Sequence, residues 1–229
     1  MPDANWIAGL PTGRLIAEYS MWSADLIRLA DDLARIEGHA DILHIDVADG
    51  HFAPALLFFP DLVARMRSAS VLPIHVHLMV SDAVLVSQVS QFADAGADLI
   101  SIHVENAAVA DEALALIRDR GLAAGAVLRV ETPVEACRPY LDRVDFLTLL
   151  GTAIGIKGVG LDPAATDRLL QAGGLIAATG RRIVLAADGG IRDHTVPLLR
   201  AAGAETVVMG SLAFGAEDLA ARMAWLHGL

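Results

Sequence analysis

The chain has 229 residues, of which 55% are hydrophobic, and its formal net charge is −11. This length suits one large domain as well as two small ones, and the apolar content is sufficient for a sizeable core. An acidic chain without a block of basic residues is a poor candidate for binding nucleic acid or an anionic membrane surface. An anionic small molecule must therefore be bound by a local cluster of donors, because the overall field repels it.

Cys137 is the only cysteine, so no intrachain disulfide is possible and nothing indicates an oxidising compartment. Because no histidine lies near it in sequence, Cys137 is better interpreted as a small packed residue than as a nucleophile. Residues 1–10 contain no basic segment followed by an apolar run, which argues against a signal peptide. The other apolar runs are of strand length, so no transmembrane helix is predicted and we expect a cytoplasmic protein.

Short apolar runs alternate with longer amphipathic segments along the chain. Such near-continuous apolar runs are typical of parallel strands covered on both faces. Strands are predicted at 14–20, 41–46, 72–79, 99–104, 123–128, 146–151, 182–187 and 206–210, and helices between them include 24–36, 83–95, 111–120 and 163–175. Repeated strand–loop–helix units with short connections favour a closed (β/α)₈ TIM barrel, here as one domain over residues 1–229.

Local signals agree with these elements. An aspartate, serine or threonine beside a proline or acidic residue is typical of a helix start, and glycine is typical just after a helix. The predicted starts are Ser81-Asp82, Thr132-Pro133 and Asp162-Pro163, and the predicted ends are Gly96, Gly121 and Gly203. The longest irregular segment, 153–160, is glycine-rich, and such a loop inside a compact fold is usually functional.

Histidine and aspartate side chains gather at the carboxyl ends of three predicted strands, where the active sites of barrels lie. His44 and Asp46 are two residues apart and therefore point to the same side of their strand. His77 and Asp188 end two further strands. Two imidazoles and two carboxylates suit Zn²⁺, Mn²⁺, Fe²⁺ or Co²⁺, and the ligand types alone do not choose among these metals. One strand histidine alone is usually structural, but four such residues together favour a metal site.

Three further polar residues lie on the same strands. His75 is two residues before His77 and should lie one layer deeper, where packing or support of a ligand fits better than ligation. His103 and Glu105 end the fourth strand and are expected to be structural residues of the rim.

Two glycine pairs and one loop are candidates for phosphate binding. Gly189-Gly190 is predicted to open the seventh helix, and Gly210-Ser211 a turn before the last helix, so that backbone N–H groups can bond phosphate oxygens. The alternative is that these glycines only form tight turns. The segment containing Gly155 and Gly158 can close over a substrate. Lys157, the only lysine, either contacts phosphate or a substrate hydroxyl there, or is a solvated loop residue.

These motifs, in this order and spacing, resemble the ribulose-phosphate 3-epimerase family from about Ser20 to Gly215. The matching pieces are Ser20 with Ser23-Ala24-Asp25, the run from His44 to Phe52, His77-Leu78-Met79, Asp188-Gly189-Gly190 and Gly210-Ser211. The resemblance implies that one divalent metal binds to His44, Asp46, His77 and Asp188. It also implies that Asp46 and Asp188 exchange protons with opposite faces of a sugar phosphate, that Ser20 and Met79 lie on the substrate side, and that the protein is a homo-oligomer.

The chemistry of a 3-epimerase fits these residues. The C3 proton of a 2-ketose lies beside the carbonyl, so its removal gives an enediolate whose charge a metal can stabilise. Inversion then needs a base on one face and an acid on the other.

The sequence departs from the family pattern around the substrate. Tyr19 replaces a proline, Ala48 and Leu150 replace methionines, and segment 153–159 replaces a loop of the type Asn-Pro-Gly-Phe-Gly-Gly-Gln. The metal-binding set is intact, so the reaction type follows from the resemblance while the substrate stays open. D-Ribulose 5-phosphate and D-xylulose 5-phosphate are the leading pair, and a tetrulose or hexulose phosphate is the alternative.

Three rival functions make different predictions. A Schiff-base aldolase needs a buried lysine, usually on a barrel strand, whereas Lys157 follows a strand in a glycine-rich loop. A decarboxylase on a related barrel would release carbon dioxide. A non-catalytic phosphosugar-binding barrel would bind ligand without exchanging its protons, and the pair of aspartates argues against it because binding alone does not need them.

Overall fold

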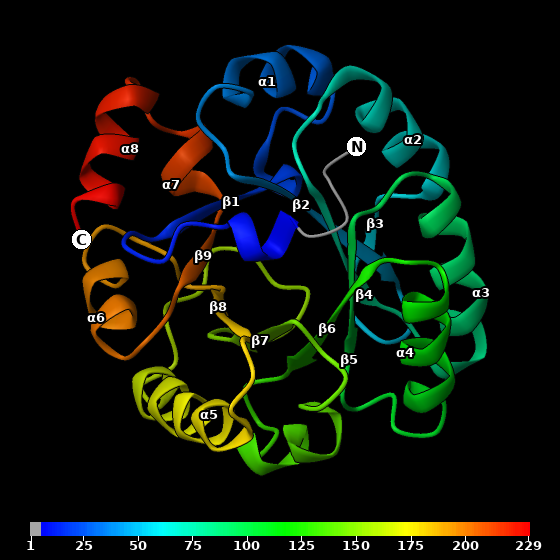
Figure 1. Cartoon of the computed structure of the whole chain (residues 1–229). Coiled ribbons are helices and arrows are strands. Elements are labelled where there is room, and N and C mark those ends of the chain that lie inside the picture. The colour runs from blue at the N-terminus through cyan, green and yellow to red at the C-terminus, as the bar shows by residue number, and fades with distance from the viewer. Residues whose placement is uncertain (1–5) are drawn as a thin grey trace.

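The computed structural model describes residues 6–229, and these form a closed barrel of parallel strands surrounded by helices (Figure 1). The barrel order runs from β1 through β9, β8, β7, β6, β5 and β4 to β2, and pairing of β1 with β2 closes it. The strands are β1 (Ile16–Ser20), β2 (Ile42–Asp49), β4 (Ile74–Met79), β5 (Leu99–His103), β6 (Ala123–Leu128), β7 (Phe146–Leu150), β8 (Val184–Asp188) and β9 (Thr206–Met209). The short β3 (Leu56–Leu57) pairs antiparallel with the end of β2.

Helices connect successive strands on the outside of the barrel (Figure 1). They are α1 (Leu29–Ile36), α2 (Pro60–Ala69), α3 (Asp82–Asp94), α4 (Ala110–Asp119), α5 (Ala165–Thr179), α6 (Val196–Ala201), α7 (Ser211–Phe214) and α8 (Leu219–His227), with 3₁₀ helices η1 (Trp6–Gly9), η2 (Met21–Ser23) and η3 (Val134–Tyr140). The predicted (β/α)₈ barrel and its eight strands are therefore confirmed. Among residues 6–229, no helix combines the length and apolar character needed to cross a bilayer.

Three predicted helix starts differ from the structure. The segment from residue 24 begins with a turn, because the Asp25 carboxylate accepts a hydrogen bond from the N–H of Ile27, and α1 starts only at Leu29. The Asp162 carboxylate similarly bonds the N–H of Ala164, and α5 starts one residue later. Thr132-Pro133 precedes a 3₁₀ helix, η3, and not an α-helix.

The barrel interior is layered. At the amino-terminal end of the strands, apolar side chains pack together, and residues of the amino-terminal segment cover them (the blue segment across the barrel in Figure 1). Trp6 lies against Phe146 with ring centroids 6.4 Å apart. Above this floor lies a buried polar layer that includes Glu18 and His75, and above that layer is the carboxyl-terminal mouth. The sequence prediction of one domain from residue 1 includes residues 1–5, which lie outside the described residues.

Candidate active site and metal centre

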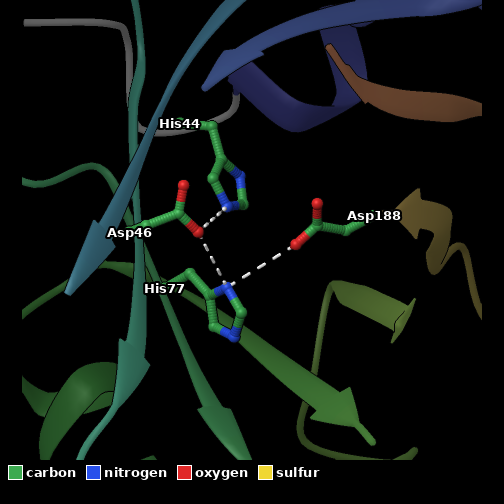
Figure 2. A group of neighbouring side chains, drawn as sticks. All are labelled: His44, Asp46, His77 and Asp188. Atoms are coloured by element: carbon green, nitrogen blue, oxygen red, sulfur yellow. Dashed lines mark ion pairs between the residues drawn. The ribbon is translucent and has the colours of Figure 1, made fainter. Parts of the chain in front are cut away.

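Four side chains from three strands meet at the carboxyl-terminal mouth of the barrel (Figure 2). His44 and Asp46 lie on β2, His77 lies on β4, and Asp188 ends β8. Their placement follows from the strands: side chains two residues apart share a face, and Asp46 and His77 are direct partners in the β2–β4 register. The structure thus brings together all four residues that the sequence singled out.

The distances within this group fit a bound cation. Oδ1 of Asp46 lies 3.4 Å from Nε2 of His44 and 3.4 Å from Nδ1 of His77, and Oδ2 of Asp188 lies 3.8 Å from the same His77 nitrogen. Ligand atoms around a tetrahedral metal with bonds of about 2.0–2.2 Å are separated by about 3.3–3.6 Å. The two imidazole nitrogens are buried and have no hydrogen-bond partner among the described residues. Such nitrogens are available to a metal.

The opposite nitrogen of each imidazole is held by a buried partner. Nδ1 of His44 lies 2.9 Å from Oε2 of Glu18. Nε2 of His77 lies 2.8 Å from Nε2 of His103, whose Nδ1 lies 3.0 Å from Glu105. If each carboxylate accepts a proton-bearing nitrogen, the nitrogens that face the site are the unprotonated ones, as a metal requires.

The expected rim position is wrong for His103 but not for Glu105, which lies in the turn after β5 with its side chain 20% exposed. His103 is fully buried and bonded to His77, and Glu105 ends that chain of contacts. His103 ends β5, which pairs with β4, so its side chain faces the barrel interior beside His77. His75, in contrast, lies deeper as predicted, in contact with Glu18 and Ser101.

The surroundings of the two carboxylates in this group give them different pKa values. Burial would raise the pKa of Asp46, but the nearby imidazoles of His44 and His77 outweigh it and, in the metal-free protein, hold that pKa well below its ordinary value. Burial raises the pKa of Asp188 to about 6 in the metal-free protein, against the effect of His44 and together with the nearby charge of Asp46. Two carboxylates with different proton affinities suit acid and base roles.

The pKa of His44 also responds to its surroundings. Burial would lower it, but Asp46 and Glu18 outweigh that effect and raise the pKa well above its ordinary value. A metal ion at Nε2 would therefore displace a proton from this imidazole.

A cavity of about 260 Å³ opens above Asp46, His77 and Asp188. The loops after β1, β7, β8 and β9 form its walls. Every residue that the sequence assigned to substrate or phosphate binding lines this cavity, namely Ser20, Met79, Gly155, Lys157, Gly158, Gly189, Gly190, Gly210 and Ser211. Ser20 also donates a hydrogen bond of 2.7 Å to Oδ2 of Asp46, which fixes that carboxylate relative to the cavity.

The glycine pair after β8 is in a loop and not at a helix start, which corrects the sequence prediction, because α6 begins only at Val196. Gly189 and Gly190 have φ of 89° and 70°, in the left-handed region that favours glycine. A Cβ on Gly189 would lie 2.3 Å from Oγ1 of Thr152, and one on Gly190 would lie 2.7 Å from the backbone of Leu161. These positions therefore leave room only for glycine, and both residues line the cavity.

Lys157 lies at the edge of the cavity, in the loop after β7. Its Nζ donates a hydrogen bond of 2.5 Å to the carbonyl of Trp22 and lies 4.5 Å from the centre of the Trp22 ring. Gly155, at φ 69°, lets the same loop lie against Pro54, because a Cβ there would be 3.0 Å from the proline ring. The loop after β7 thus contacts the loops after β1 and β2 across the mouth.

Sequence reasoning missed two residues. Arg192 follows the glycine pair and lines the cavity, and within residues 6–229 no carboxylate lies within 4 Å of its side-chain nitrogens. Its only signal was a cation two residues after a pair of glycines. Glu18 lies below the site on β1, and its signal was an acidic residue inside a strand predicted to be buried.

Comparison with known proteins places this site in a family. Residues 16–214 match the model of the ribulose-phosphate 3 epimerase family. The chain belongs to this family. The protein is therefore an epimerase, a class of isomerase, as the sequence resemblance implied.

Named relatives are similar in sequence to this epimerase along most of its length. It is 39% identical over 206 residues to ribulose-phosphate 3-epimerase 2 of Cupriavidus necator, which covers 87% of this chain and 84% of the relative. It is 33% identical to ribulose-phosphate 3-epimerase of Bacillus subtilis, covering 87% of this chain and 92% of that one. The enzyme of the same name from Escherichia coli strain K12 is 34% identical, with 87% and 88% covered.

Solved structures of other enzymes share the fold of this epimerase. Orotidine 5'-phosphate decarboxylase from Pyrococcus horikoshii superposes with a TM-score of 0.66 at 10% identity, covering 93% of this chain and 97% of that one. A 3-hexulose-6-phosphate synthase superposes with a TM-score of 0.62 at 18% identity, covering 93% and 99%. At these identities the likeness concerns the barrel alone.

We predict that the metal-depleted epimerase binds one equivalent of Co²⁺ or Zn²⁺ and that His77→Ala loses this binding. Loss of an outer partner typically weakens metal binding by about 10–100-fold, and loss of a direct ligand should cost more. Competition against a fluorescent chelator measures the affinity. His194→Ala, which removes an exposed histidine, is the control and should bind as the wild type does. Equal affinity in His77→Ala and the wild type would contradict the assignment.

Proposed function

We propose that this epimerase inverts C3 of a ketose phosphate in a metal-dependent reaction, with D-ribulose 5-phosphate and D-xylulose 5-phosphate as the leading pair. The observation that carries the proposal is the placement of Asp46 and Asp188. Both carboxylates line the same cavity, both contact His77, and they come from strands separated by β1 and β9.

We propose His44, Asp46, His77 and Asp188 as the ligands of one divalent cation, Zn²⁺, Mn²⁺, Fe²⁺ or Co²⁺. The unpaired buried nitrogens and the spacing of the ligand atoms support this set. When bound, the cation would stabilise the negative charge that develops on the substrate oxygens after loss of the C3 proton.

Asp46 and Asp188 act as the two acid/base groups. The C3 proton is acidic because it lies next to a carbonyl, so one carboxylate removes it and the other returns a proton to the opposite face. The roles exchange in the reverse direction. Ser20 donates a hydrogen bond to Asp46 and holds that carboxylate in position. The apolar floor closes the other end of the barrel, so water can enter only through the mouth.

The phosphate binds at the other end of the cavity, at the loops after β8 and β9. Backbone N–H groups near Gly189, Gly190, Gly210 and Ser211 supply donors without added charge, and Arg192 is a nearby cation without a carboxylate partner among residues 6–229. This local cluster offsets the net charge of −11, which otherwise repels an anion.

The rival aldolase function receives no support. Lys157 is exposed, lies in a loop and bonds the Trp22 carbonyl, whereas a Schiff-base lysine must reach the substrate carbonyl from a buried position. The choice among pentulose, tetrulose and hexulose phosphates depends on the loop after β7, where Ile156 and Val159 are 47% and 40% exposed at the cavity.

We predict that Asp46→Asn and Asp188→Asn each abolish epimerisation. An asparagine cannot accept the C3 proton, and general acid or base catalysis contributes about 10²–10⁴-fold. The assay is conversion of D-ribulose 5-phosphate with saturating metal. Asp167→Asn, an exposed carboxylate on α5, should match the wild type. Turnover near that of the wild type in either active-site variant would refute the two-base mechanism.

Lys157→Ala tests the contact proposed for the loop after β7. If Lys157 reaches phosphate or a hydroxyl as the loop closes, truncation removes a charge-assisted hydrogen bond of roughly 1.5–3 kcal/mol and lowers kcat/KM about tenfold to a hundredfold. Metal affinity should not change. Arg65→Ala, which removes an exposed cation from α2, controls for the change in net charge. A loss of less than about twofold would mean that Lys157 does not contact the substrate.

A further inference from the structure

A layer of polar side chains lies directly beneath the proposed metal centre, in the middle of the barrel. Glu18 on β1 is 0% exposed. Its Oε2 lies 2.9 Å from Nδ1 of His44 and 2.8 Å from Nδ1 of His75, and its Oε1 lies 3.1 Å from Oγ1 of Thr206. His75 is held from its far side by Ser101, with 2.6 Å between Nε2 and Oγ. Glu18 is thus the centre of a network that spans five strands, β1, β2, β4, β5 and β9.

The charge of Glu18 has no ordinary counter-ion. Burial of a carboxylate costs several kcal/mol unless an opposite charge or hydrogen bonds offset it. Among residues 6–229, only His44 and His75 form ion-pair contacts with Glu18, and no lysine or arginine does. The floor below is apolar. A positive charge that balances Glu18 must therefore lie on one of these two imidazoles or on a cation that His44 binds through Nε2.

The other proposed imidazole ligand has a different support. His77 reaches Glu105 through His103, and Glu105 also accepts hydrogen bonds from Arg129 N–H and the Thr132 hydroxyl. The side chain of Glu105 is 20% exposed. Water and backbone donors therefore stabilise that carboxylate without a metal, whereas Glu18 has neither.

The hydrogen-bond arrangement of the network fixes one tautomer of His44. Oε2 of Glu18 is an acceptor between two Nδ1 atoms, so both imidazoles donate through Nδ1–H. Nε2 of His75 then accepts from Ser101, and Nε2 of His44 presents its lone pair beside Asp46. This is the orientation that a metal ligand requires.

We propose that Glu18 is a positioning residue of the metal centre. It directs Nε2 of His44 to the metal and places a buried negative charge on the far side of the His44 imidazole. His75, Ser101 and Thr206 hold Glu18 in this position. The inference rests on the proposed metal centre and extends it to a second layer of residues that do not touch the substrate cavity.

Glu18→Gln tests this role, because glutamine has the same shape and keeps one oxygen for His44 but lacks the charge. We expect Co²⁺ affinity to fall by about 10–100-fold, with the visible absorption of bound Co²⁺ unchanged in shape because the ligands stay in place. The rise in Tm on adding Co²⁺ should shrink in parallel, since stabilisation by a ligand follows its affinity.

Glu18→Met removes both the charge and the acceptor. Replacement of a buried ionic group by an apolar one of similar volume is often tolerated, so this variant keeps the test available if glutamine impairs folding. Without an acceptor for Nδ1, His44 loses its fixed orientation. We expect a larger loss of Co²⁺ affinity than in Glu18→Gln and an altered absorption spectrum.

Asp98→Asn is the matched control, because Asp98 is another buried carboxylate but lies before β5, where it contacts Arg67 and the N–H of Ile74. It should lower Tm and leave Co²⁺ affinity unchanged. If the wild type binds Co²⁺ and the affinities of both Glu18→Gln and Glu18→Met lie within about twofold of its affinity, the role of Glu18 is overturned and the metal centre is not. Wild-type protein that binds no Co²⁺ would overturn the proposed metal centre itself, and this inference with it.

Discussion

Two imidazole nitrogens, from neighbouring strands, face one carboxylate oxygen at 3.4 Å without forming a hydrogen bond to it. This arrangement of His44, His77 and Asp46 is unfavourable for buried polar groups unless a cation lies among them. It depends on the barrel, because only paired parallel strands place Asp46 opposite His77 and only alternation puts His44 on the same face. The supporting carboxylates and the cavity are arranged around this cluster.

Different layers of the barrel contribute to stability and to chemistry. The apolar floor and outer helices provide burial, the polar middle layer orients the imidazoles, and the loops at the mouth form the cavity. Barrels with 10% and 18% identity to this chain serve as a decarboxylase and a synthase, so the framework does not determine the reaction. The reaction depends on the residues at the strand ends and in the loops.

The sequence predicted the strands and the four residues at the mouth because both depend on local patterns. Apolar runs mark covered strands, and residues two apart share a face. It did not predict the role of Glu18 or His103, because their partners lie on other strands and strand register is not a local property. Gly189 was assigned to a helix start for a similar reason: its close approach to Thr152, on the loop after β7, depends on how two loops pack, which the local sequence does not show.

The central claim is that this epimerase exchanges the C3 proton of a ketose phosphate through two carboxylates. Proton NMR of D-ribulose 5-phosphate, incubated in D₂O with the metal-loaded protein, tests it directly, and tetrulose and hexulose phosphates can be examined in the same way. The account predicts that deuterium from solvent enters C3 of both epimers as they interconvert, at a rate that falls to background when the metal is removed. Interconversion in D₂O with no deuterium at C3 of either epimer, or undiminished exchange without metal, would contradict it.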